Sequence, residues 1–140
     1  MKIGYFISVA LFVCLAVYMY NGCKPVWQFD HLEQNAKKVI TARELQSWAT
    51  NLLVRYPVET NFSASELGTN FPHKLRTLAP RLGPHIFVHV YDDTNQPPYV
   101  QVYWGSGFLG GTGFFIGATN YVADTGSEHA WQPGVYFYRR

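Results

Sequence analysis

The strongest hydrophobic pattern in the chain is a helical stripe over residues 41–56. Apolar residues recur there at spacings of three and four, which places them on one helical face: Leu45, Trp48, Ala49, Leu52, Leu53 and Tyr56. Thr41 and Glu44 have the spacing of a capping box. Pro57 ends the stripe, because the residue before a proline avoids the α region. We therefore predict an amphipathic helix with Trp48 at the centre of its buried face.

Four later segments have the composition of β-strands and are bounded by turn residues: Ile86–Tyr91, Tyr99–Trp104, Thr112–Ala118 and Val135–Tyr138. In the first two segments, aliphatic residues alternate with aromatic and polar ones. The aliphatic face should lie under the amphipathic helix, which leaves the aromatic face outward. The pattern predicts an α+β fold in which one amphipathic helix packs on a roughly four-stranded antiparallel sheet.

An uncharged apolar run, residues 3–20, precedes this domain. Its length is at the lower limit for a membrane-spanning helix, and it also suits the core of a signal peptide. Gly22 and Pro25 then break the helical pattern. We predict an N-terminal hydrophobic helix, transmembrane or signal, within residues 1–23, a linker at 24–40 and a small α+β domain at 41–140.

Three fates of the N-terminal segment remain open: retention as an anchor, cleavage as a signal peptide, or lipidation. Cys23 follows Gly22 in a lipobox-like context and is the lipidation candidate. Cys14 lies nine residues earlier, about 13 Å along a helix, so the two cysteines are too far apart for a disulfide. The very short positive segment before the apolar run is typical of export. We expect a membrane contact through residues 3–20 and a domain on the extracytoplasmic side.

An apolar N-terminal helix before a small αβ domain resembles the plan of type IV pilins and pseudopilins. Gly4 and Tyr5 match cleavage after a glycine in that family. Val9 stands where the family has an early glutamate, and Gly22 and Pro25 interrupt what would be one long helix. The resemblance covers the general layout alone and implies a filament or secretion-complex subunit.

Composition and charge exclude one class of partner. The chain is 17% aromatic and only 14% charged, with a formal net charge of +2. No stretch forms the clustered basic face that nucleic-acid binding requires. We therefore expect no nucleic-acid partner, and a domain that packs many rings.

The glycine-rich stretch at residues 104–117 contains a formal G-x-G-x-x-G at Gly105, Gly107 and Gly110. A dinucleotide site needs a helix directly after these glycines. The following residues, TGFFIGA, favour a strand instead. We interpret the stretch as a hairpin connection and expect no nucleotide and no cofactor.

The outward aromatic face is the candidate binding surface. Its rings resemble surfaces that stack on sugars or bury a protein partner, so a protein or a glycan is the expected ligand. The candidate binding residues are Phe87, His89, Tyr91, Tyr99, Tyr103 and Phe108, the last in the glycine-rich stretch. The alternative is that the linker or the long 117–134 segment covers these rings.

Histidines and carboxylates offer little metal or catalytic chemistry. His85 and His89 share one face of a predicted strand but lie about 13 Å apart, too far to bind one metal ion, so no metal site is predicted. The weak catalytic candidates are Asp124, Glu128 and His129, which lie within six residues of one another. Catalysis would need a nucleophile and a base within hydrogen-bond reach.

Three functional hypotheses follow from the sequence. The leading one is a non-catalytic binding or interaction module of the cell envelope. The first rival is a small hydrolase built around His129, Glu128 and Asp124. The second rival is a pilin-like or secretion-complex structural subunit that assembles through residues 3–20.

Overall fold

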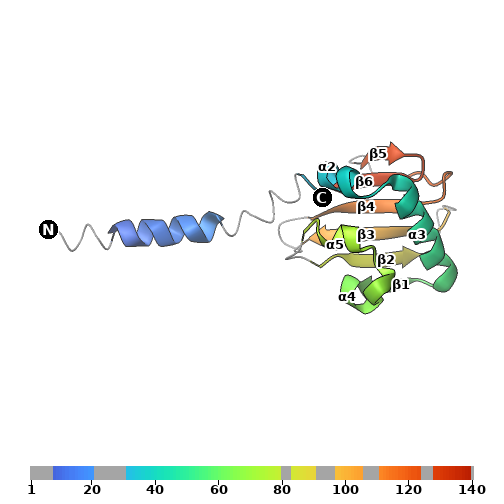
Figure 1. Cartoon of the computed structure of the whole chain (residues 1–140), viewed down its shortest axis with the longest axis horizontal. Coiled ribbons are helices and arrows are strands. Elements are labelled where there is room, and N and C mark those ends of the chain that lie inside the picture. The colour runs from blue at the N-terminus through green and yellow to red at the C-terminus, as the bar shows by residue number, and fades with distance from the viewer. Residues whose placement is uncertain are drawn as a thin grey trace.

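The computed structural model describes residues 8–20, 31–79, 83–90, 97–105, 111–123 and 128–139. The fold is α+β, with one six-stranded antiparallel sheet in the order β1-β2-β3-β4-β6-β5. Helices α2, α3 and α5 lie over one face of the sheet (Figure 1). The elements are α2 (Leu32–Val39), α3 (Ala42–Arg55), β1 (Thr60–Ser63), α4 (Ala64–Leu67), η1 (Gly68–Asn70), α5 (His73–Arg76), β2 (His85–His89), β3 (Tyr99–Gly105), β4 (Gly111–Gly117), β5 (Glu128–Gln132) and β6 (Val135–Arg139).

A further helix covers residues 8–20, and most of its large apolar side chains are exposed. Across the described ranges, no helix combines the length and the apolar character that crossing a membrane requires. The predicted apolar segment, residues 3–20, begins before these ranges, and Cys23 lies outside them. The membrane, signal and lipidation assignments therefore stay predictions.

Helix α3 forms as the apolar stripe predicts. Thr41 is its N-cap: the Thr41 hydroxyl accepts from the Glu44 backbone N–H, and the Glu44 carboxylate accepts from the Thr41 backbone N–H at 2.7 Å. The helix ends at Arg55, two residues before Pro57. Its buried residues, Ala42, Leu45, Ala49 and Leu52, face β3 and β4. The predicted capping box and amphipathic helix are confirmed.

The capping box makes stability depend on pH. A hydrogen bond from Lys74, followed by those from Thr41, lowers the pKa of Glu44 from its usual 4.5 to about 2. The unfolded chain binds this proton near pH 4.5, whereas the folded chain does so only near pH 2. The resulting stabilisation is complete above the unfolded pKa and is lost as the pH falls through the folded pKa.

We therefore expect Glu44→Gln to lower the thermal midpoint at neutral pH, and the difference from wild type to shrink to a small fraction near pH 2. The check is thermal unfolding followed by circular dichroism across this pH range. Glu33→Gln is the control, because within the described ranges Glu33 forms only an exposed pair with Lys37 four residues away. A gap between wild type and Glu44→Gln that is as large at pH 2 as at neutral pH would contradict the capping-box account.

The sheet has two more strands than the roughly four that the sequence predicts. Both additions are edge strands of polar composition, β1 with the sequence TNFS and β5 with EHAWQ. β1 pairs with β2, and β5 pairs with β6 through a register shift between Ala130 and Gln132. Short polar strands lack the alternation that identifies a half-buried strand, which is why the count of four was wrong.

Part of the stretch expected to be a linker, residues 24–40, is helical. Helix α2 buries Leu32 and Ala36 in the same core as α3 and the sheet. Its eight residues contribute only these two buried positions, one turn apart, which is too short a pattern to identify from sequence. The helical part of the stretch therefore packs with the domain.

Of the glycines in the 104–117 stretch, those that the structure describes lie in strands, whereas Gly107 and Gly110 fall outside the described residues. Gly105 ends β3, Gly111 begins β4, and the two residues pair directly in an antiparallel hairpin. The hairpin interpretation is confirmed, and the element after the glycines is strand β4, not the helix that a dinucleotide fold requires.

Glycines also alternate along β4, where Gly111, Gly113 and Gly117 lie on the outward face. A Cβ at Gly111 would lie 2.3 Å from the Tyr103 ring, and one at Gly117 would lie 2.5 Å from Cβ of Tyr121. The absence of side chains at these positions lets tyrosine residues pack directly over the strand.

Candidate functional site

The outward face of the sheet carries a continuous series of stacked rings. His89 stacks on Tyr99 with ring centroids 4.5 Å apart, and Tyr99 stacks on Tyr121 at 4.7 Å. Phe115 stacks on Tyr138 at 4.4 Å. Phe115, Tyr121 and Tyr138 are buried by this packing and form a second, smaller hydrophobic cluster. The inner part of the aromatic face is therefore a core in its own right.

The structure brings together four of the six predicted binding residues. Phe87, His89, Tyr99 and Tyr103 all lie on this outward face and are partly exposed. Tyr91 and Phe108 fall outside the described residues. Because the Tyr99 ring has His89 and Tyr121 stacked against it, little of its face is left for a ligand. The binding role of these four residues stays a prediction.

A polar chain crosses the same face. His89 Nδ1 lies 3.5 Å from a Glu59 carboxylate oxygen, and His89 Nε2 lies 3.4 Å from Gln101 Oε1. Gln101 Nε2 in turn donates to Tyr138 Oη at 2.8 Å. Beside His89 is a small hollow of about 200 Å³, lined by Glu59, Thr60, Asn61, Phe87 and His89. This volume is below the range typical of small-molecule sites.

The weak catalytic candidates are only partly described. His129 is exposed on the edge strand β5 and pairs with Phe137. Glu128 pairs with Tyr138 through its backbone, whereas its side chain and all of Asp124 fall outside the described residues. Within the described ranges, no group of three or more His, Cys, Asp or Glu residues is placed to hold a metal ion. The hydrolase hypothesis thus stays untested.

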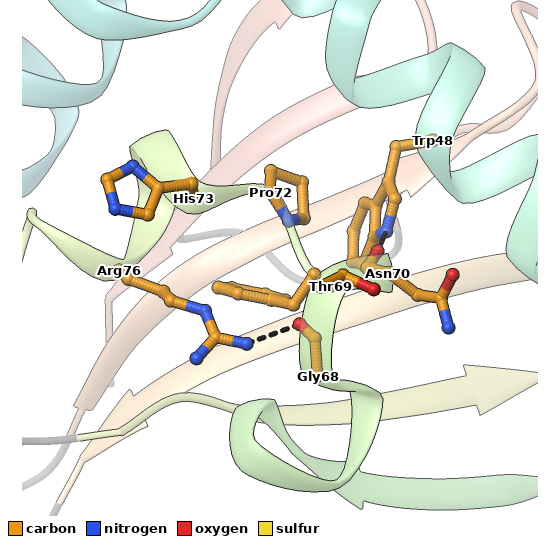
Figure 2. A pocket seen from close by; sticks show the side chains of 8 residues that line it. Trp48, Gly68, Thr69, Asn70, Pro72, His73 and Arg76 are labelled. Carbon is orange, nitrogen blue, oxygen red and sulfur yellow. Dashed lines mark hydrogen bonds between the residues drawn. The ribbon is translucent and has the colours of Figure 1, made fainter.

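A larger hollow than the one beside His89 lies on the helical side, between α3 and α5. Its volume is about 660 Å³, within the range of small-molecule sites. It is open to solvent and is lined by Trp48, Gly68, Thr69, Asn70, Phe71, Pro72, His73 and Arg76. We call it the Trp48–Arg76 hollow. Figure 2 shows Trp48 and Arg76 on opposite sides of Pro72.

Two aromatic rings form the apolar part of the Trp48–Arg76 hollow. Trp48 meets Phe71 edge to face, with ring centroids 5.7 Å apart. Phe71 is almost fully buried, whereas Trp48 stays partly exposed. The indole Nε1–H of Trp48 donates to the Asn70 carbonyl at 2.7 Å, which fixes the orientation of the ring. The fold itself therefore sets the orientation of the Trp48 side of the wall.

Arg76 supplies the charge of the Trp48–Arg76 hollow. Its Nη2 donates to the Ala64 carbonyl at 2.9 Å and also to the Gly68 carbonyl (Figure 2). Its Cζ lies 5.7 Å from the centroid of the Phe71 ring, within cation–π range. These contacts hold the guanidinium in place, half-buried beside an apolar wall.

Sequence reasoning did not find this hollow. It assigned Trp48 correctly to the apolar stripe of α3 but treated the residue as a core anchor only. The other walls come from η1 and α5, two elements of only three and four residues. The indication that was available is the local sequence FPHKLR, in which Phe71 and Pro72 precede a short helix that ends at Arg76.

Comparison of the chain with protein-family models, with curated proteins and with solved structures finds no match.

Proposed function

We propose that the protein is a non-catalytic binding module whose ligand occupies the Trp48–Arg76 hollow. The observation that carries this proposal is the hollow of about 660 Å³, in which hydrogen bonds hold the Trp48 indole and the Arg76 guanidinium. Such a mostly apolar pocket with a few oriented polar groups is the usual form of a ligand site. Pre-organised walls reduce the entropy that binding costs.

The proposal includes a membrane tether. The uncharged run of residues 3–20 favours an anchor or an export signal, and the domain would then face the extracytoplasmic side. The exposed apolar side chains of the helix at residues 8–20 support a partner for that helix, either lipid or protein. Cys23 remains the candidate for lipidation.

The outward aromatic face remains a second candidate surface, for a protein or a glycan. One observation favours it, namely the small hollow in which Phe87 and His89 lie beside Glu59 and Asn61. The hydrolase and the pilin-like subunit stay as predictions that no described contact supports.

The first test uses the full-length chain labelled with ¹⁵N at tryptophan. Pools of small water-soluble ring compounds are added while the indole N–H signals are recorded. We expect some pools to shift the Trp48 signal, because its indole N–H lies at the wall of the hollow, and to leave the fully buried Trp104 signal in place. Trp48→Phe identifies the signal and should weaken binding about tenfold.

Two outcomes would contradict the proposal. In one, no pool moves the Trp48 signal. In the other, binding is detected by calorimetry, but it survives Trp48→Phe and is lost in Phe87→Ala, which would place the ligand on the outward face of the sheet.

A further inference from the structure

We propose that the ligand of the Trp48–Arg76 hollow carries a carboxylate beside a flat apolar group. This inference rests on the proposed function and adds the chemical class of the ligand. It is carried by the charges and rings that line the hollow.

The ionisable side chains that line the hollow are basic. The residues that line the described hollow include the Arg76 guanidinium and the His73 imidazole, and no carboxylate. Lys74, the next cation on α5, is already paired with Glu44 at 2.8 Å. A single permanent cation in a mostly apolar hollow matches a singly charged anion, because an unpaired charge of either sign is costly to desolvate.

The guanidinium of Arg76 has N–H donors that its described hydrogen bonds do not use. Both described hydrogen bonds of Arg76 leave from Nη2. Within the described part of the chain, the Nε–H and the two N–H groups of Nη1 have no partner. Because the carbonyls of Ala64 and Gly68 hold the guanidinium in place, these donors are oriented in advance. A carboxylate oxygen accepts such charge-assisted bonds more strongly than a neutral carbonyl does.

The rings define the other half of the ligand. Trp48 and the Arg76 guanidinium each lie 5.7 Å from the centroid of the Phe71 ring. Pro72 lies between them in the lining. A flat apolar group can therefore rest against Trp48 and Pro72 while an attached carboxylate reaches Arg76.

Arg76 also lines a second hollow of about 400 Å³, together with Ser63, Ser65 and His85 among others. Serines and a histidine dominate its side-chain polar groups, and it has no aromatic wall apart from that imidazole. The requirement for a flat apolar group therefore assigns the ligand to the Trp48–Arg76 hollow. Because the two hollows share one guanidinium, the test must tell them apart.

The test compares N-acetylphenylalanine with its amide, which differs only in lacking the negative charge. Binding to the full-length chain is measured by calorimetry and by the Trp48 indole signal. We expect the acid to bind at least tenfold more tightly than the amide, and the advantage to shrink as salt is added. The tripeptide N-acetyl-Ala-Ala-Phe is a second arm: tighter binding than the single residue indicates a peptide C-terminus, and weaker binding indicates a free small acid.

Variants locate the charge that the acid recognises. Arg76→Gln should weaken the acid about tenfold and leave the amide unchanged. Arg43→Gln removes an equal charge from the exposed face of α3, outside the two hollows that Arg76 lines, and should change the binding of neither compound. Thermal unfolding of each variant shows whether the fold is kept.

A second pair of variants leaves Arg76 and its hydrogen bonds to the carbonyls of Ala64 and Gly68 in place. Thr69→Glu places a carboxylate in the lining of the Trp48–Arg76 hollow and should weaken the acid at least tenfold. Ser65→Glu places the same group in the lining of the second hollow and should have little effect. The opposite result would move the ligand to the second hollow and overturn the assignment.

The two proposals fail in different ways. If the acid and the amide both shift the Trp48 signal and bind with equal affinity, the hollow binds ligands but the carboxylate inference is wrong. If neither compound nor any ring pool shifts that signal, the binding function itself is wrong.

Discussion

Gly113→Ala is expected to lower the free energy of unfolding by about 3 kcal/mol or more. A Cβ at this position would lie 1.8 Å from the Val102 carbonyl oxygen and 3.0 Å from Tyr138 Oη. The nearer atom belongs to the backbone of β3, which is paired on both sides and cannot give way cheaply. Urea unfolding followed by circular dichroism measures the loss.

Gly83→Ala is the matched control for this change. Nothing lies within 4 Å of a Cβ built at Gly83, so we expect a change within about 0.5 kcal/mol. Equal stability of the two variants would mean that Gly113 is not needed for the approach of Tyr138 and the close packing of β3 on β4.

Leu45→Ala is expected to cost about 3 kcal/mol. Leu45 is fully buried at the face of α3 that packs on β3 and β4, and its removal leaves a cavity under the helix. The free energy of unfolding is measured in urea, with the Trp48 indole signal as a check that the helix keeps its position.

Val54→Ala on the same helix is the comparison, because Val54 is 79% exposed. We expect its effect to stay within about 0.5 kcal/mol. Similar losses at both positions would contradict the assignment of the buried face of α3.

Periodic patterns predicted the central part of this fold. The stripe of α3 follows from the spacing of apolar residues, and β2, β3, β4 and β6 follow from strand-like composition between turn residues, with boundaries that differ by one or two residues. These elements are the most buried, so the burial requirement fixes their sequence most strongly. The edges carry weaker patterns, and there β1, β5 and α2 were missed.

One missed strand had an available signal. Pro133 and Gly134 join β5 to β6, and Gly134 has a φ of 84°, the conformation that a glycine tolerates best. A Pro-Gly pair before the predicted strand Val135–Tyr138 indicates a hairpin and therefore a preceding strand. Gln46 of α3 donates to the Pro133 carbonyl at 3.0 Å and so ties this turn to the helix.

The candidate site was less predictable because tertiary contacts assemble it. The Trp48–Arg76 hollow depends on α3, η1 and α5 meeting, and on the hydrogen bond between Trp48 and the Asn70 carbonyl, 22 positions away. Sequence periodicity identifies the buried face of one helix but not the gap between two. On the aromatic face, the alternation of residues along the strands predicted which rings point outward. It did not predict that these rings bury one another, because that burial depends on Tyr121, which lies outside any strand.

The most direct test of the account is to locate a bound ligand by intermolecular nuclear Overhauser effects between N-acetylphenylalanine and the full-length chain. The account predicts contacts from the ligand ring to the Trp48 indole and Pro72, with the ligand carboxylate near Arg76. Contacts to Phe87, His89 or Tyr103 instead would place binding on the outward face of the sheet and contradict the account.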